Sequence, residues 1–157
     1  MKISIRPAHL DDIKDMQKFM YLLMKEEYEQ FDPTNKITWA KSKKCADYFK
    51  NRITNAKSLA IIAEHKGEKI GYLSAQINGA FEYRSVPKFG VLADMFVLEE
   101  HRNLTIGTKL IKEFKKWAKK KGAKRIRVQS FAKNEKALRF YRRHGFDDHD
   151  TILEGKI

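Results

Sequence analysis

The segment Leu92–Phe146 constrains this chain most, because it predicts a strand, a tight turn and an amphipathic helix in direct succession. Residues 92–97, Leu-Ala-Asp-Met-Phe-Val, alternate without Gly or Pro, which is typical of a strand. An amphipathic pattern follows the turn at 102–108 and runs to about Lys121. The first N–H groups of a helix have no partner within it, and the helix dipole places partial positive charge behind them. The turn therefore predicts a binding site for a pyrophosphate.

A second group of residues, about thirty positions further on, completes a known pattern. Arg102 and Gly107 are followed by Asn134, Ala137, Tyr141 and Gly145-Phe146. This series resembles the GNAT superfamily of acetyl-CoA-dependent N-acetyltransferases. The opening residues 3–8 and the predicted strand at 68–72 also look like the first and third strands of that family, so the resemblance covers nearly the whole chain.

The order of predicted elements agrees with the order that the resemblance implies. We expect an α/β fold of the GNAT type, a mixed and largely antiparallel central sheet flanked by helices, in the order β-α-α-β-β-β-α-β-α-β. The predicted elements are a strand at 3–6, helices at about 10–28 and 39–53 with Thr38 as the second N-cap, a hairpin of 59–64 and 69–77, a strand at 90–97, the helix ending near 121, a strand at 124–129, a helix at 135–144 and a last strand within 146–153.

The length and composition fit one domain covering residues 1–157, since the sequence has no internal repeat and no composition break. It has no run of about twenty apolar residues, and its first residues already alternate like a strand, so we expect neither a membrane span nor a signal peptide. A cytoplasmic protein is therefore expected. Cys45 is the only cysteine, which excludes an intramolecular disulfide, and the five histidines lack metal-ligand spacing, so no metal site is predicted.

The positive charge is concentrated in the C-terminal third. Residues 1–100 hold 16 Lys or Arg and 14 Asp or Glu, a net charge of +2, whereas residues 101–157 hold 17 and 6, a net charge of +11. This excess would steer a polyphosphate such as coenzyme A, or nucleic acid, toward the predicted turn. The alternative is that Lys109, Lys112, Lys115, Lys116, Lys119 and Lys120 are only the solvated face of one helix.

The resemblance implies that acetyl-CoA is the acetyl donor, held where the strand meets the turn. The positions that match the family's coenzyme site are Met95, Phe96, Val97, Arg102, Asn103, Leu104, Thr105, Ile106, Gly107, Thr108, Asn134 and Tyr141. A main-chain N–H near Met95 or Phe96 would polarise the thioester carbonyl. Asn134 would hydrogen-bond the coenzyme, although by position alone it is a helix N-cap.

Thr105 departs from the family pattern, because it stands where the family usually has its first glycine. Glycine lets the backbone approach a phosphate closely, and a side chain narrows that space. We expect the Thr105 hydroxyl to cap the helix or to bind a phosphate oxygen, so that the site is kept.

Two residues are candidates for catalysis. Tyr141 occupies the family's Tyr position, and a phenol with a pKa near 10 stays protonated at neutral pH and can donate to the departing sulfur. Spacing alone favours Tyr141 as a core aromatic on one helix with Leu138 and Phe140, and it is the resemblance that favours the catalytic role. Asp94 lies two residues before Phe96 on the same strand face and is the candidate base, with a polar strand-end residue as the equal alternative.

Four further residues are candidates for binding the acceptor. Glu29 and Asp32 lie in the connection between the first two helices, which borders the acceptor pocket in the family, and they would attract a cationic amine. Glu82 and Tyr83 lie in the loop before the central strand. A solvated loop explains all four as well. The predicted partner is an amine-bearing small molecule or protein.

We therefore predict an acyltransferase that moves an acetyl group from acetyl-CoA to a primary amine by direct transfer in a ternary complex. The sequence lacks G-x-x-x-x-G-K-[S/T], G-x-G-x-x-G and G-x-S-x-G motifs, and nothing in it suggests covalent catalysis. A non-catalytic acyl-CoA-binding module remains an alternative. A basic nucleic-acid-binding protein is disfavoured, because no known motif accompanies the charge. The sequence identifies neither the amine nor the oligomeric state, and a homodimer remains one of the alternatives.

Overall fold

One five-stranded sheet in the order β1-β2-β3-β4-β5 organises the chain, and the computed structural model describes residues 2–102 and 105–157. The β1–β4 pairs are antiparallel and β4–β5 is parallel, as the predicted mixed sheet requires. The elements are β1 (Ile3–Pro7), η1 (Leu10–Asp12), α1 (Ile13–Gln30), η2 (Ile37–Lys41), α2 (Lys43–Thr54), β2 (Ser58–His65), β3 (Glu68–Gly79), β4 (Lys88–Val97), η3 (Glu99–His101), α3 (Ile106–Lys120), β5 (Arg125–Val128) and α4 (Glu135–Arg143).

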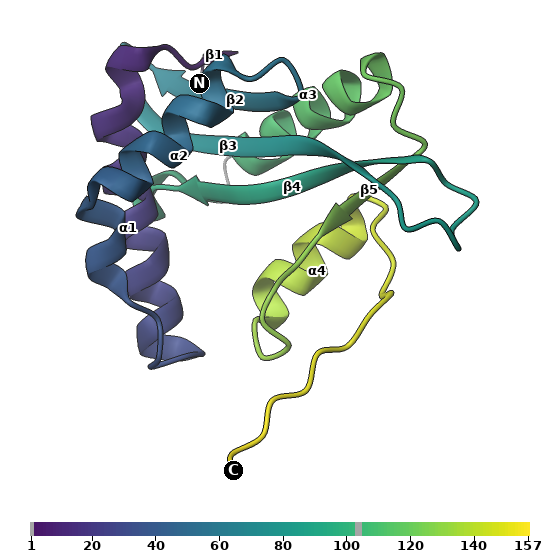
Figure 1. Cartoon of the computed structure of the whole chain (residues 1–157). Helices are drawn as coiled ribbons and strands as arrows, with labels where there is room; N and C mark the ends of the chain where they lie inside the picture. The colour runs from purple at the N-terminus through teal and green to yellow at the C-terminus, as the bar shows by residue number, and fades with distance from the viewer. Residues whose placement is uncertain (1, 103–104) are drawn as a thin grey trace.

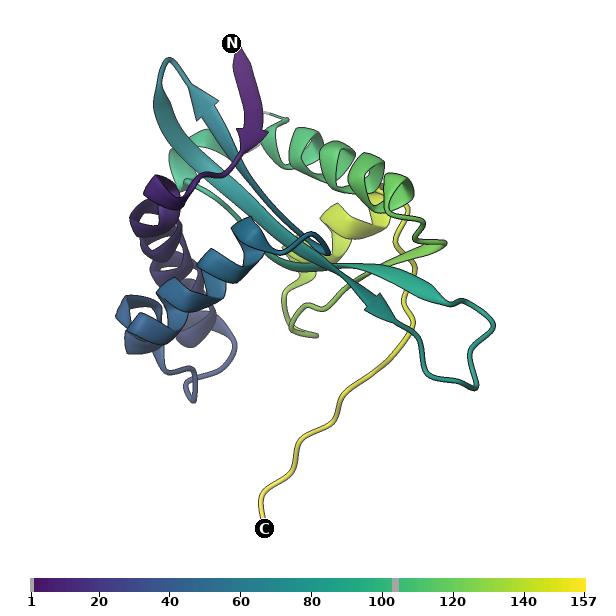
Figure 2. The same cartoon turned by 45° about the horizontal axis from the view of Figure 1, so that its top comes forward.

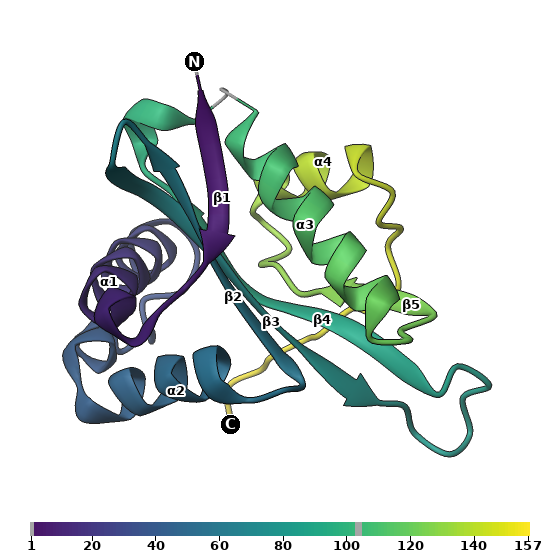
Figure 3. The same ribbon diagram turned by 90° about the horizontal axis from the view of Figure 1, so that it is seen from above.

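The helices cover the two faces of the sheet in pairs, α1 and α2 on one face and α3 and α4 on the other (Figures 1 and 3). Helix α3 buries Leu110, Phe114 and Ala118, which recur every four residues and so form one stripe toward the sheet. Helix α1 buries Met16, Phe19 and Met20 in the same way. The middle strands β2 and β3 are buried on both faces, because helices cover both sides of them.

A β-bulge in β4 shapes the sheet near its centre. Ser74 of β3 pairs with Asp94, while the next residue, Ala75, pairs with Leu92, so Ala93 is an extra residue in β4. On its other side, β4 pairs with β5 only from Phe89 to Leu92. Strand β5 ends at Val128, the partner of Leu92, and the chain that follows β5 leads away from β4 toward α4 (Figures 1 and 2). The edge of β4 that follows the bulge is therefore free of strand partners within the described part of the chain.

A buried ion cluster fastens the N-terminal end of the fold. Asp12, with its side chain 4% exposed, accepts two hydrogen bonds from the Arg6 guanidinium at 2.8 and 3.0 Å and lies 2.8 Å from Lys69 Nζ. Arg6 also binds Glu64. These bonds, the Arg6 bond above all, hold the pKa of Asp12 well below its usual range. The cluster thus links η1 to β1, β2 and β3.

Three sequence predictions about elements were wrong. Ser42, not Thr38, is the N-cap of α2: its hydroxyl accepts from Cys45 N, while Thr38 lies inside η2. Leu10, the first residue of the helix predicted at about 10–28, lies instead in η1, before α1 begins, and is 51% exposed. The predicted last strand within 146–153 is absent from the described residues. Among residues 2–102 and 105–157, no helix combines the length and the apolar character needed to cross a membrane.

The residues after α4 make side-chain contacts and form no strand beside β5. Asp148 accepts two hydrogen bonds from Arg142 of α4, both 2.8 Å long, and His149 lies 3.0 Å from Arg84. Aspartate also has a low preference for strands. Phe146 itself is buried in the core, and the last residues of the chain run away from the sheet as an extended tail (Figure 1).

Candidate active site

The free edge of β4 presents main-chain groups toward the space between β4 and β5. Leu98 N–H donates to Ile70 O of β3 at 2.9 Å. Because alternate residues of an antiparallel strand point their main chain to the same neighbour, Phe96 also faces β3, and Met95 and Val97 face the opposite edge. Val97 O accepts there from Arg102 Nε at 2.9 Å. The sequence left two N–H groups as candidates for polarising the thioester. The N–H of Met95 faces the opening, whereas the N–H of Phe96 faces β3 and its ring lies in the α1/α2 core.

The turn into α3 provides free amide donors. The first main-chain hydrogen bond of α3 runs from Lys109 N to Thr105 O at 3.0 Å. The N–H groups of Ile106, Gly107 and Thr108 precede it and have no acceptor within the helix. The predicted coenzyme contacts at Asn103 and Leu104 lie outside the described residues.

Thr105 corrects one expectation about this turn. Its φ of 65° and ψ of 1° place it in the left-handed region, and its side chain makes no capping hydrogen bond in the described structure. An N-cap residue normally has extended dihedrals, which aim its hydroxyl at the amides of the next turn. The left-handed backbone removes that alignment. The family glycine at this position is explained by the backbone angle, which glycine adopts without a steric cost.

Arg102 anchors the turn to the sheet and to α1. Its guanidinium donates to Val97 O and, at 2.6 Å, to Glu26 of α1, and it lies 5.1 Å from the ring centre of Phe96. The side chain that the sequence assigned to the pyrophosphate is therefore engaged in internal contacts.

Helix α4 packs against the start of α3 through a glycine. A Cβ added at Gly107 would lie 3.0 Å from Phe140 Cζ, so the absence of a side chain lets the two helices approach. Asn134 caps α4, since its Oδ1 accepts from Ala137 N at 3.1 Å. The N-cap role expected from its position is thus present, and its amide NH₂ remains available as a donor.

Tyr141 lies on the side of α4 that faces β4 and β5. It packs against Phe140 and Phe146 and lines a groove of about 520 Å³ beside β5. Burial raises its pKa to about 12, and the negative charges of Asp94 and Glu27 add to the shift. At neutral pH the phenol is protonated.

Asp94 lies on the α1/α2 face of β4, as its spacing from Phe96 predicts. Its Oδ2 accepts from the Tyr48 hydroxyl and from the Ser74 hydroxyl, each at 2.5 Å. Burial raises its pKa, while the two hydrogen bonds and the positive charge of Arg52 lower it. No sequence pattern connects Asp94 with α2, because Tyr48 is 46 positions away.

Glu27 is a carboxylate that the sequence analysis did not single out. It is half-buried on α1, burial raises its pKa, and Asp94 is among the negative charges that raise it further. Its position seven residues after Met20 continues the inward stripe of α1, and this is the signal that could have identified it. Near it, the rings of Phe31 and Phe131 stack at 5.6 Å and join the α1–η2 connection to the β5–α4 connection.

The four candidate acceptor residues are not brought together. Glu29 is exposed, 3.8 Å from Lys25, and Asp32 closes a local turn by accepting from Thr34. Glu82 and Tyr83 lie in the β3–β4 loop, where Tyr83 stacks on Phe81. This loop leads into the start of β4, which is six residues, or about 20 Å of strand, away from Asp94, so Glu82 and Tyr83 are far along the strand from the candidate base.

The lysines of α3 divide into two groups. Lys112, Lys116, Lys119 and Lys120 are exposed, as expected for a solvated helix face. Lys115 Nζ donates to His144 O at 2.5 Å and Lys109 Nζ donates to Ile3 O at 3.5 Å, so these two link α3 to its neighbours.

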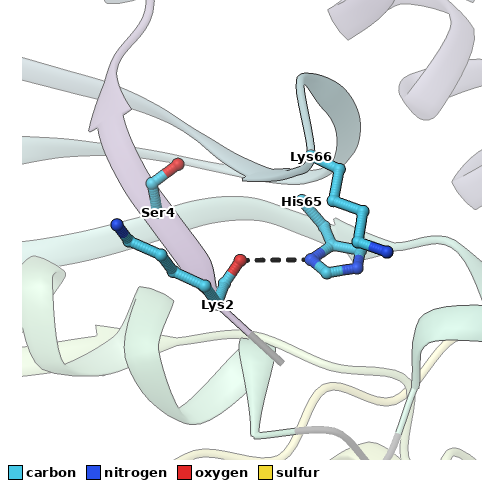
Figure 4. Close-up of a pocket in the computed structure, with 4 residues that line it drawn as sticks. All are labelled: Lys2, Ser4, His65 and Lys66. Carbon is cyan, nitrogen blue, oxygen red and sulfur yellow. Dashed lines mark hydrogen bonds between the residues drawn. The ribbon is translucent and has the colours of Figure 1, made fainter.

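A separate hollow of about 500 Å³ lies at the opposite edge of the sheet (Figure 4). It is lined by Lys2, just before β1, by Ser4 of β1, by His65 at the end of β2 and by Lys66 of the β2–β3 turn, and His65 Nδ1 lies 3.1 Å from Lys2 O. None of the candidate catalytic or coenzyme residues lines this hollow.

Comparison with known proteins assigns the family. Residues 17–146 match the acetyltransferase (GNAT) family. The chain belongs to this family. The uncharacterized N-acetyltransferase YhfO of Bacillus subtilis is 32% identical over 101 residues, covering 64% of this chain and 66% of that protein. An uncharacterized N-acetyltransferase of Methanocaldococcus jannaschii is 28% identical over 151 residues, covering 95% of this chain and 62% of that protein. The matches thus span just under two thirds of the length of these two relatives.

The fold of this GNAT chain is also found in solved structures. A predicted acetyltransferase from Clostridium acetobutylicum, crystallised with acetyl-CoA, superimposes with a TM-score of 0.77 at 20% identity, covering 99% of this chain and 96% of that one. At this identity the likeness is one of fold. It agrees with the sheet and helix arrangement that the sequence predicted.

Proposed function

We propose that this GNAT protein transfers an acetyl group from acetyl-CoA to a primary amine, directly and within a ternary complex. The observation that carries the proposal is the free edge of β4 beyond Leu92, which has a half-buried carboxylate, Asp94, on the strand itself and a protonated phenol, Tyr141, across the opening. An acyl donor lying along that edge would have a base and an acid within reach. Family membership supports the same reaction.

The residues present fit a pantetheine and pyrophosphate ligand. The main-chain groups of Met95 and Val97 would pair with the amides of the pantetheine arm, as a neighbouring strand would. The free amides of Ile106, Gly107 and Thr108, at the positive end of α3, would bind the pyrophosphate. Asn134 would donate from its amide. When bound, acetyl-CoA supplies the activated acyl group.

Each step of the transfer then has a residue. Asp94 accepts a proton from the amine, whose nitrogen attacks the thioester carbon. Met95 N–H stabilises the negative charge that develops on the carbonyl oxygen. Tyr141, with a pKa of about 12, remains protonated until the C–S bond breaks and then donates to the sulfur. Glu27 attracts the amine as a cation, since it is a half-buried carboxylate of α1, the helix that covers the face of the sheet carrying Asp94.

Coenzyme binding and transfer are tested separately. Acetyl-CoA should raise the midpoint of thermal unfolding, and the shift should shrink as salt rises, because the turn lies in the segment with a net charge of +11. Release of free thiol is then measured with a panel of primary amines, namely butylamine, putrescine, lysine and a short peptide with a free N-terminus. A midpoint shift without thiol release for any amine would identify a non-catalytic coenzyme-binding module instead.

The acid is tested by Tyr141→Phe, which keeps the ring and its contacts with Phe140 and Phe146. We expect kcat to fall on the order of 10²-fold with acetyl-CoA affinity nearly unchanged, because the hydroxyl acts only as charge develops on sulfur. Tyr28→Phe is the matched control, since Tyr28 is an exposed tyrosine of α1. If kcat is unchanged in Tyr141→Phe while chemistry limits turnover, Tyr141 is a core aromatic without a catalytic role.

A further inference from the structure

One oxygen of Asp94 is held by two hydroxyl groups from different elements. Tyr48 of α2 and Ser74 of β3 each donate to Oδ2 at 2.5 Å, and their own oxygens lie 3.5 Å apart. Ser74 is fully buried and faces Asp94 directly across the β3–β4 ladder. Both hydroxyls therefore approach the carboxylate from the α1/α2 side of the sheet.

The tyrosine that makes this contact is fixed by its surroundings. Its ring packs edge-on against Trp39 and Phe49, with ring centres 5.9 and 5.2 Å apart. The guanidinium of Arg52 lies 4.7 Å from the centre of the same ring and donates to Gln76 of β3. A side chain packed on several sides keeps one rotamer, so the Tyr48 hydroxyl has little freedom to leave Asp94.

The two carboxylate oxygens of Asp94 differ in the hydrogen bonds that they accept. Oδ2 already accepts two hydrogen bonds, whereas Oδ1 accepts none from the residues that the structure describes. A carboxylate oxygen that has two donors is a poor acceptor for a further proton, and the unbound oxygen is the better one. The contacts thus orient Asp94 with one oxygen reserved for an incoming proton.

We propose that Tyr48 and Ser74 are positioning residues that hold Oδ2 of Asp94 so that Oδ1 takes the proton from the amine. The inference rests on the proposed acetyltransferase function and adds to it two residues and one specific atom. In the step, the amine nitrogen loses a proton to Oδ1 and forms the N–C bond, the C–S bond breaks, and the sulfur receives its proton from Tyr141. For an amine that arrives as an ammonium ion, one proton is released per turnover.

The same contacts affect the protonation of Asp94. Two donors to the charged form lower its pKa and so oppose burial, which raises the pKa. Loss of either hydroxyl should therefore raise the pKa further. The other titratable groups that face Asp94 are Glu27 of α1, Cys45 and Arg52 of α2, Tyr72 of β3 and Tyr141 of α4.

The test uses Tyr48→Phe and Ser74→Ala in the full chain, with saturating acetyl-CoA and the best amine of the panel. Each variant should lower kcat roughly 10-fold, a typical effect of removing a group that orients a functional ligand. The KM for acetyl-CoA should not change. The acid limb of the kcat/KM profile should move to higher pH, because the base is then protonated over a wider range. A purely structural role would lower stability without moving that limb.

Two control variants and one further measurement make the result interpretable. Tyr21→Phe changes another half-buried tyrosine of the same layer, whose ring lies beneath Lys41, and should leave kcat and the pH profile unchanged. A ¹³C NMR titration of the Asp94 carboxyl needs no amine and should show a higher midpoint in both variants than in the wild type. Ser74→Thr, which retains a hydroxyl, should recover the wild-type acid limb.

The possible failures are distinct. A wild-type protein that transfers acetyl to none of the amines would remove the proposed function and this inference with it. Transfer by the wild type, with kcat and the acid limb unchanged in both Tyr48→Phe and Ser74→Ala, would overturn the inference alone. An unchanged NMR midpoint in folded variants would do the same.

Discussion

Replacing Thr105 by glycine should stabilise this protein, although glycine at most helix starts does not. Thr105 has a φ of 65°, a backbone angle that costs a side-chain-bearing residue roughly 1–2 kcal/mol and is least favourable for β-branched residues. Glycine avoids that cost but loses about 0.4–1 kcal/mol through the greater freedom of the unfolded chain. The net expectation for Thr105→Gly is a gain on the order of 0.5 kcal/mol, or about 1–2 °C in Tm for a domain of this size.

Thr105→Ala separates backbone strain from hydrogen bonding. It removes the hydroxyl and keeps the Cβ, so with no capping bond in the described structure it should change the free energy of unfolding by less than about 0.5 kcal/mol. If the hydroxyl did cap α3, Thr105→Ala would instead cost about 1 kcal/mol and Thr105→Gly a few tenths. The two accounts therefore differ in the sign expected for glycine.

The assay is urea denaturation of the three proteins, followed by calorimetric titration with acetyl-CoA. Lys66→Gly is the matched control, because Lys66 is the other non-glycine residue with positive φ in the described ranges and lies at the β2–β3 turn. It should stabilise the fold similarly and leave acetyl-CoA binding unchanged, whereas Thr105→Gly should bind acetyl-CoA equally or more tightly. A clear loss of stability in Thr105→Ala would refute the strain argument.

Two further predictions concern the fold that holds the site. The lowered pKa of Asp12 means that its contribution to stability is complete above its unfolded pKa, near 3.9, and is lost as pH falls through the folded value. Asp12→Asn should therefore lower the free energy of unfolding, measured by urea denaturation, by about 3 kcal/mol at pH 7 and by less at pH 3. The control Asp15→Asn changes a side chain that is 42% exposed and should lower it by under about 1 kcal/mol. Equal effects of the two substitutions would contradict a special role for Asp12. Gly90→Ala would place a Cβ 2.7 Å from Ala118 Cβ and should destabilise by about 1–3 kcal/mol, while Gly79→Ala, with nothing within 4 Å, should be nearly neutral. Tolerance of Gly90→Ala would show that α3 shifts freely over β4.

The central part of the fold was predictable because its signals are local and repeated. The strand and the helix predicted within 90–121 are confirmed as β4 and α3, with ends differing by a few residues. Apolar residues at period two or near four fix which face is buried, and this holds wherever neighbouring elements cover that face. The same logic failed for Leu10, where a 3-10 turn interrupts the helical period.

The end of the chain shows where local pattern is insufficient. The sequence after Phe146 predicted a strand, yet Arg142 binds Asp148 and Arg84 lies beside His149, and no strand forms there. A strand is stable only when its hydrogen-bonding groups find a partner edge. Whether that edge is used depends on competing side-chain contacts, which the sequence pattern does not contain.

The sequence by itself determined the mixed sheet, the order of its elements as far as α4 and the helix start that presents free amides, since each follows from residue spacing and from the geometry of a helix start. Only the tertiary structure decided what surrounds Asp94. Tyr48 and Ser74 reach it from 46 and 20 positions away, and Glu27 comes close to it from another helix. The backbone angle of Thr105 was likewise set by the path between β4 and α3, not by the preference of threonine. Hydrogen bonds and charge interactions act through distance in space, so the chemical environment of a residue is fixed only when the chain has folded.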